Sequence, residues 1–307
     1  MRHMLKNMEG APFSFPDLSR RGFLIAGGMA VAATGALPAI PACTLKSEQE
    51  EGPYYIDDAT LRRDITEGKP GVPLMLAVRL VDARRCAPLP DAALDIWHCD
   101  ASGVYSGFTA NSPDRGPDGI PGRGRPGPPP EFREGGFVPG MPPPGFAGGG
   151  PDGPRARQTD ATRYLRGVQI SDASGLVEFS TLYPGWYSGR AIHIHAKVHI
   201  GGEAAKKYAG GHVAHTGQLF FPEELTDRIS RIEPYARRID VYRTTQADDG
   251  IFNSQHGAEC MLNIERLGKT DGDGFRAAIT LAIDPEATPA PVGGFGGRGP
   301  GGPPRRG

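Results

Sequence analysis

The chain has 307 residues, of which 34 are lysine or arginine and 35 are aspartate or glutamate, so its formal net charge is −1. Because there is no excess of basic residues, the composition does not favour a nucleic-acid partner, and none is expected. Its 45 glycines and 31 prolines are concentrated in a few segments. Without those segments about 200 residues remain, which is enough for one well-buried domain.

Residues 1–42 are predicted to be a Tat signal peptide. The pair Arg20-Arg21 precedes a run from Ile25 to Ala39 that is rich in alanine and glycine. This run is too short and too weakly apolar for a stable membrane span, so we expect the leader to be removed on export. The expected location is periplasmic or extracellular. The alternative is a chance pair of arginines before an apolar helix.

Short runs in which apolar and polar residues alternate are separated by turn signals throughout residues 43–285. This period of two is typical of β-strands, which we expect at residues 74–80, 93–99, 164–170, 176–179, 193–200, 218–221, 259–267 and 275–283. The last two should form a hairpin around a glycine-rich loop, and one short helix is predicted at Pro222–Asp227. The predicted fold class is all-β, an antiparallel β-sandwich with few short helices.

Two segments, residues 112–156 and 286–307, are crowded with proline, glycine and arginine. They are predicted to be a disordered insertion in the domain and a disordered tail. Triplets that begin like collagen are broken at Arg125, so a triple helix is not supported. The insertion starts close to Tyr105, a candidate ligand described below, and a lid over the site is therefore a hypothesis.

The four cysteines all follow the predicted leader, at Cys43, Cys86, Cys99 and Cys260. An oxidising compartment favours disulfides, and four cysteines allow three pairings among which the sequence does not choose. Cys99 could equally be a buried free thiol, because it lies on a predicted core strand. A zinc site is not expected, since no Cys-x-x-Cys spacing is present.

The run His193-Ile194-His195 places two imidazoles on one face of a predicted strand, because side chains alternate between the two faces. Both rings can therefore reach one metal ion. Tyr187 lies just upstream, and a phenolate is a hard anionic oxygen donor, which together with imidazole suits ferric iron better than zinc. For the His-x-His pattern alone, a solvated polar stripe continued by Lys197 and His199 is the alternative.

Further motifs occur in a fixed order around this run. Their sequences are Glu48–Tyr55, Trp97-His98 followed by Gly103-Val104-Tyr105, Leu165-Arg166-Gly167, Tyr183-Pro184-Gly185-Trp186-Tyr187, Arg190-x-x-His193-x-His195, Gln218–Leu225 and Asp249–Phe252. This series resembles the intradiol ring-cleavage dioxygenases, the non-haem ferric family that includes catechol and protocatechuate dioxygenases. The resemblance covers most of residues 43–285 apart from the insertion, and the family's fold is also a β-sandwich.

The resemblance implies an Fe(III) centre and no organic cofactor. The residues that fall on the four iron ligands are Tyr105, Tyr187, His193 and His195. Tyr187 falls on the tyrosine that is released when substrate binds and then serves as a base. Arg190 matches the arginine that stabilises negative charge on the substrate ring, and Gln218 matches a second polar residue near the ring. A turn tyrosine at position 105 and a plain salt bridge at Arg190 are the alternatives.

The implied reaction uses O2 to cleave a catechol-type ortho-diphenol between its two hydroxylated carbons, giving a muconate-type diacid. Two other classes stay open: a non-catalytic exported β-sandwich module that binds phenolics or polysaccharide, and a metallohydrolase that uses the same histidines. The sequence also leaves a homo-oligomer open. Tyr183 is expected to pack in the core and His98 to be a satisfied buried histidine, while surface or loop positions are expected for His199, His212, His215 and His256.

Overall fold

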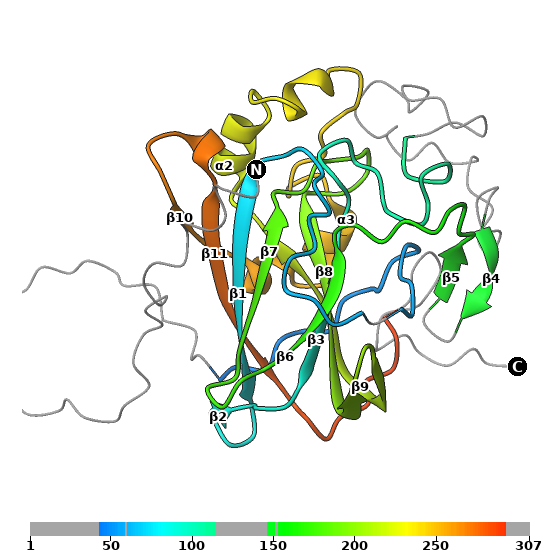
Figure 1. Cartoon of the computed structure of the whole chain (residues 1–307), viewed down its shortest axis with the longest axis vertical. Helices are drawn as coiled ribbons and strands as arrows, with labels where there is room; N and C mark the ends of the chain where they lie inside the picture. Colours follow the sequence, from blue (N-terminus) through cyan, green and yellow to red (C-terminus); the bar gives the residue numbers. More distant parts are fainter. Residues whose placement is uncertain (1–42, 59, 115–145, 151–152, 293–307) are drawn as a thin grey trace, which may run out of the picture. The chain divides into compact units, whose positions relative to one another are not determined.

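Figure 1 shows the computed structural model of the chain, which describes residues 43–58, 60–114, 146–150 and 153–292. Three predicted segments lie wholly or partly outside the described residues: the Tat signal peptide (1–42), the insertion (115–145 and 151–152) and the tail (293–307). Within the part of the chain that is described, no helix is both long and apolar enough to cross a membrane.

Two sheets form the body of the domain (Figure 1). The first has the order β10-β11-β1-β2, with β7 also paired to β1, and its strands are β1 (Pro73–Asp82), β2 (Ala87–Pro88), β7 (Leu176–Leu182), β10 (Asn263–Arg266) and β11 (Phe275–Ile283). The second has the order β6-β3-β8-β9, with β3 (Ala93–Trp97), β6 (Arg166–Ile170), β8 (His193–Ala204) and β9 (Tyr208–Phe220). The all-β class predicted from the alternating runs is confirmed.

One core lies between the two sheets, which makes the domain a sandwich. Leu76 and Val78 of β1 are buried in the same cluster as Ile194, Ala196 and Val198 of β8. Because side chains alternate along a strand, the odd-numbered residues of β8 face the opposite side of the second sheet. Both histidines of the His-x-His run therefore lie on this outer face, where a smaller cluster forms from Tyr54, Tyr55, Ile56, Trp97, Cys99, Tyr105, Phe108 and Tyr187.

The ladders are antiparallel with one exception in the two main sheets. Strands β1 and β11 run parallel, with Leu74 opposite Phe275 and Asp82 opposite Ile283. The predicted hairpin is present as the antiparallel pair β10–β11. A parallel pair cannot be joined by a tight turn, so local patterns could not reveal the β1–β11 ladder, whose strands come from opposite ends of the domain.

Residues 43–55, here called the N-terminal strap, run from β11 of the first sheet along β9 to the outer face of the second sheet. Its first residue, Cys43, forms a disulfide with Cys86 in the β1–β2 turn, with Cα atoms 5.3 Å apart, whereas Cys99 and Cys260 are free and buried. Farther along, the backbone N–H of Gln49 donates to the carbonyl of Thr216 at 2.8 Å. The strap is therefore held at its start by a covalent bond and along β9 by hydrogen bonds.

The helices of the described residues are short and lie in the connections. The predicted helix is confirmed as α2 (Glu223–Ile229). The chain also has α3 (Gly250–Ser254) and 3₁₀ turns η1 (Tyr235–Arg237), η2 (Gly257–Cys260) and η3 (Asp271–Asp273), which are too short to give a helical period in the sequence. Asp249 caps α3, because its side chain accepts hydrogen bonds from the backbone N–H groups of Ile251 and Phe252.

Several expectations need correction. The predicted insertion is too long at its end, since β4 (Phe146–Gly150) pairs with β5 (Gly153–Ala156) and the N–H of Ala156 donates to the carbonyl of Pro53 at 2.8 Å. Strand β9 begins at Tyr208, ten residues before the predicted start at position 218. His215, expected at the surface, is buried and bonds through Nδ1 to Glu48 at 2.5 Å.

Candidate metal centre and active site

Four side chains from three parts of the fold meet on the outer face of the second sheet. The two histidines project from β8, Tyr187 from the turn before it, and Tyr105 from the loop that follows β3. Nε2 of His193 lies 3.0 Å from Nε2 of His195 and 3.2 Å from Oη of Tyr187, whose Oη lies 3.3 Å from that of Tyr105. The structure thus brings together all four residues that the sequence predicts as ligands.

The histidine rings are held in fixed orientations. Nδ1 of His193 bonds to the carbonyl of Ala191 at 2.6 Å, which turns Nε2 toward the other donors. The ring of His195 stacks on Trp97, with ring centroids 4.8 Å apart and planes 2° from parallel. On another side of that ring lies Gly52, where a Cβ would come within 3.1 Å of Cε1. Trp97 and the strap residue Gly52 therefore fix the position of His195.

Tyr105 is fixed by its loop and by the strap. Its backbone N–H donates to Oγ of Ser112 at 2.8 Å, and its ring stacks on Tyr54 with centroids 4.6 Å apart. The buried side chain of Arg166 donates to the carbonyl of Ser106, the next residue, at 2.9 Å. These contacts hold both the loop backbone and the ring. Tyr105 is therefore a buried phenol in a fixed position and not an exposed turn tyrosine.

Burial sets the protonation of all four groups. It lowers the pKa of His193 to about 3 and that of His195 well below its ordinary value, so both imidazoles are neutral, which is the form that binds metal. It raises the pKa of Tyr105 and of Tyr187, so both phenols are protonated in the absence of a cation. A bound cation would favour the phenolates and reverse that preference.

The donor set fits a ferric ion. A metal bonded to oxygen and nitrogen at about 2 Å holds neighbouring donors roughly 3 Å apart, and the three contacts here are 3.0, 3.2 and 3.3 Å. Among the described residues, no group of three or more histidine, cysteine or acidic side chains could hold a metal. An ion at this point therefore depends on both tyrosines, and hard phenolate oxygen with imidazole suits Fe(III).

Arg190 lies beside the four donors in a network of its own. Its Nε donates to both carboxylate oxygens of Asp249 at 3.1 Å, its Nη1 lies 3.4 Å from Glu50, and its Nη2 donates to the side-chain oxygen of Gln218. Burial alone would lower the pKa of Arg190, but Asp249, Tyr187 and Glu50 outweigh it and raise the pKa. Arg190 is therefore a charged guanidinium, as the predicted role requires. It also forms a salt bridge with Asp249, which was the alternative interpretation of this residue.

Two members of this network, Asp249 and Glu50, had no role assigned from the sequence. Asp249 is fully buried and also accepts the backbone N–H of Ala191 at 2.9 Å. Glu50 belongs to the strap, and its carbonyl accepts the side-chain amide of Gln218 at 3.0 Å. Both lie inside motifs that carry the family resemblance, but nothing local in the sequence shows that they face Arg190.

His98 and Tyr183, which were expected to have structural roles, are both buried and hydrogen-bonded away from the four donors. His98 is wholly buried, bonding through Nε2 to Thr181 at 2.7 Å and through Nδ1 to the carbonyl of Cys99 at 2.8 Å, and burial lowers its pKa to about 4. Oη of Tyr183 lies 2.7 Å from Oγ1 of Thr226, and its ring packs on Phe221 in the main core. Neither residue reaches the four donors.

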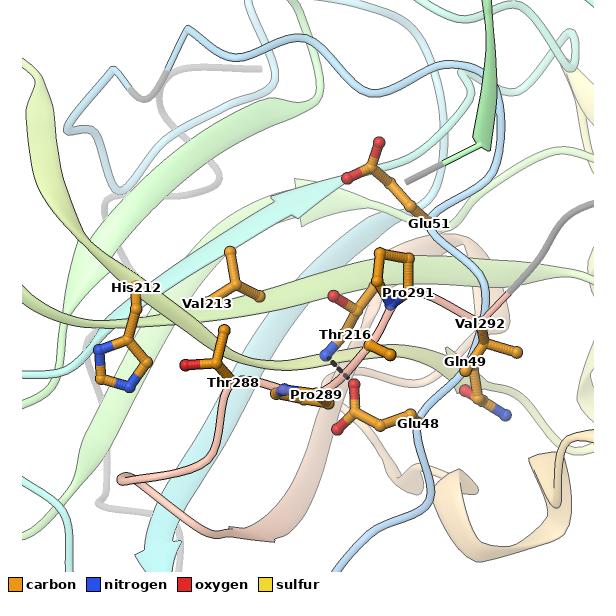
Figure 2. A pocket seen from close by; sticks show the side chains of 11 residues that line it. Glu48, Gln49, Glu51, His212, Val213, Thr216, Thr288, Pro289, Pro291 and Val292 are labelled. Atoms are coloured by element: carbon orange, nitrogen blue, oxygen red, sulfur yellow. Dashed lines mark hydrogen bonds between the residues drawn. The ribbon is translucent and has the colours of Figure 1, made fainter. Parts of the chain in front are cut away.

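Two hollows flank the strap. Figure 2 shows one, with a volume of about 380 Å³, between the strap residues Glu48, Gln49 and Glu51, strand β9 and residues 288–292. The other, of about 460 Å³, is lined by Tyr55, Asp57, Arg155, Lys197, His199, Tyr208, Ala209, Gly210, Gly211 and Val213. Neither is lined by Arg190 or by any of the four donors, so the chemistry of the site does not reside in these two hollows.

Comparisons with known proteins find similarity to dioxygenases. A family model described as dioxygenase matches residues 50–119, and a search of the curated proteins found no match. An intradiol ring-cleavage dioxygenase from Tetranychus urticae is 31% identical, with 80% of this chain and 98% of that chain covered and a TM-score of 0.60. A second solved dioxygenase is 30% identical over the same shares, with a TM-score of 0.59.

The matching family model and both of these solved structures give the class of the protein as a dioxygenase. Identity of 31% to the intradiol ring-cleavage dioxygenase, over 98% of that solved chain, narrows the class to one family. The chain belongs to the intradiol ring-cleavage dioxygenase family.

Proposed function

We propose that this protein is a non-haem Fe(III) dioxygenase that uses O2 to cleave a catechol-type ortho-diphenol between its hydroxylated carbons, giving a muconate-type diacid. The observation that carries the proposal is the convergence of two phenol oxygens and two imidazole nitrogens, each within 3.3 Å of the next. The dioxygenase family to which the chain belongs supports the reaction class.

Ferric iron, when bound by Tyr105, Tyr187, His193 and His195, would supply a Lewis acid that binds the substrate oxygens and prepares the ring for O2. Tyr187 is 9% exposed, whereas the other three side chains are at most 3% exposed. It is therefore the group that an incoming substrate would meet, and its Oη would take up a proton from a substrate hydroxyl.

Arg190 and Gln218 would act on the ring. The guanidinium of Arg190 stabilises negative charge that develops on the substrate, and it does so strongly because the site is buried. Asp249 holds Nε of Arg190 from behind, and Gln218 accepts a hydrogen bond from Nη2. These contacts fix the direction of the guanidinium before substrate arrives.

The visible spectrum of the purified protein, recorded before and after anaerobic addition of catechol, tests the proposal. A burgundy colour that shifts with catechol, followed by uptake of O2 and release of a ring-opened diacid, is the expected result. A protein that stays colourless and free of iron after ferric reconstitution would contradict it and favour a non-catalytic module that binds phenolics or polysaccharide. Bound zinc would favour a metallohydrolase.

We also propose that the protein is exported by the Tat system to the periplasm or beyond. The twin arginines support this, and so does the Cys43–Cys86 disulfide, since disulfides persist in oxidising compartments. Fractionation of cells that express the full chain or the Arg20→Lys/Arg21→Lys variant is the test. The variant should stay in the cytoplasm, and an unchanged distribution would contradict Tat export.

A further inference from the structure

The side chain of Glu50 places a second acidic group against Arg190. Oε1 of Glu50 lies 3.4 Å from Nη1 of Arg190, and the carboxylate is 10% exposed. Nε of the same guanidinium is already matched by Asp249 at 3.1 Å. One cation therefore faces two carboxylates.

Glu50 is held where it is by its own backbone. Its N–H donates to the side-chain oxygen of Gln255 at 2.8 Å, and its carbonyl accepts the side-chain amide of Gln218 at 3.0 Å. The strap on either side is fixed by Gln49, which accepts the N–H of Gln218 at 2.6 Å, and by Gly52 against His195. The backbone from which the carboxylate projects is therefore fixed beside Arg190.

Three other basic side chains around the site have acidic partners as well. Arg155 and Lys197 both pair with Glu51, and Tyr55 and Trp97 lie between Lys197 and His195. Arg238 lies 3.7 Å from Asp114. A fourth, Arg166, donates to Ser106 and is separated from Gln218 by Trp97 and His195 in the order β6-β3-β8-β9. A carboxylate on a substrate ring would meet Glu50 without a compensating cation.

We propose, on the basis of the function proposed above, that Glu50 is a specificity-determining residue which excludes catechols that carry an anionic ring substituent. Neutral catechols and catechols with a cationic side chain are the substrates that this charge arrangement accepts. A like charge held a few ångströms away in a buried site disfavours the complex, and an opposite charge at the same place favours it.

The test compares kcat/KM for 4-methylcatechol, 3,4-dihydroxybenzoate and dopamine, whose substituents are neutral, anionic and cationic. The wild-type enzyme should disfavour 3,4-dihydroxybenzoate against 4-methylcatechol by on the order of tenfold or more. Glu50→Gln keeps the shape of the side chain and should reduce that ratio by on the order of tenfold, while lowering the relative rate with dopamine.

Glu48→Gln is the matched control, because Glu48 is a carboxylate of the same strap that bonds to His215 and Thr216 and not to Arg190. It should leave the ratios among the three substrates unchanged. Ratios that are equally unchanged in Glu50→Gln would overturn the proposal, as would a wild-type enzyme that prefers 3,4-dihydroxybenzoate.

Anaerobic calorimetry of the same three compounds separates this proposal from the proposed function. If the wild-type protein cleaves none of them, the proposed reaction fails, but the order of the three dissociation constants still reports on Glu50. Weaker binding of 3,4-dihydroxybenzoate than of 4-methylcatechol would uphold the charge selection in that case. Equal binding would overturn it whether or not the ring is cleaved.

Discussion

Tyr183 and Tyr187 lie four residues apart in the turn that enters β8, yet they face different clusters. Tyr183 is in the main core and contacts Thr226, whereas Tyr187 contacts Tyr105 and His193. Tyr187→Phe should abolish much of the tyrosinate-to-iron absorption and lower kcat by roughly 10²–10⁴. Tyr183→Phe is the control, which should keep the spectrum and lose about 1 kcal/mol of stability. The reverse pattern in the two spectra would identify Tyr183 as the ligand.

Gly52 is the point at which the strap contacts His195. Its φ is +74°, and a Cβ there would lie 3.1 Å from the ring. Gly52→Ala should therefore displace His195 and weaken iron binding, in addition to about 1 kcal/mol of backbone strain.

Gly68→Ala provides a matched comparison, because Gly68 has φ +72° and no other atom lies within 4 Å of the place that a Cβ would take. That variant should show the backbone strain alone, with normal iron content measured by metal analysis of the purified protein. Equal iron content in the two variants would show that the strap does not position His195.

For single residues, the sequence predicted the candidate site best where its members lie close together along the chain. Tyr187, His193 and His195 lie within nine residues of the sequence, and the structure brings their donor atoms within 3.2 Å of one another in series, although their role as ligands stays a prediction. Glu50 and Asp249 lie 140 and 59 residues from Arg190. Such contacts are created by tertiary structure, so no periodicity or spacing in the sequence could indicate them.

Among the elements, α3 is short, but it helps to position Arg190. Its capping residue, Asp249, accepts a hydrogen bond from Nε of Arg190. Asp249→Asn keeps an oxygen for the cap but removes the charge that pairs with the guanidinium. We expect kcat/KM to fall at least tenfold and unfolding free energy to fall by about 1–3 kcal/mol.

Thr270, which caps η3 far along the chain, is the control for the cap itself. Thr270→Ala should lose about 1 kcal/mol of stability with unchanged kcat/KM, so the two variants together separate capping from catalysis. If Asp249→Asn lost stability alone, the positioning of Arg190 would not depend on Asp249.

The strands whose apolar residues alternate were predictable, as β1 and β8 show. The hairpin between β8 and β9 was not, because its outer half, from Gly201 to Gly211, is rich in glycine and largely exposed. There the strands are maintained by backbone hydrogen bonds, which leave no apolar pattern. Gly201, Gly210 and Gly211 have positive φ. Clustered glycines are typical of loops, so the sequence predicts a loop there, although the β8–β9 ladder continues to the pair Ala204 and Tyr208.

For the molecule as a whole, the Cys43–Cys86 disulfide closes a loop with a sequence separation of 43 residues. A cross-link of this length restricts the unfolded chain, and its loss should lower the unfolding free energy by about 2–4 kcal/mol. Thermal unfolding with and without dithiothreitol measures this. Cys43→Ser/Cys86→Ser should unfold at the lower temperature in both conditions, and a reductant effect that persisted in this variant would point to another thiol.

The parallel pairing of β1 with β11 affects how the protein folds during synthesis. Strand β1 leaves the ribosome early and its partner leaves near the end of the domain, so one side of β1 has no neighbour during most of translation. An unpaired apolar edge is prone to aggregation, and closing so long a loop is slow. Nascent chains should stay sensitive to protease until Ile283 has emerged, and the apolar residues of β1 are where a chaperone would have to act.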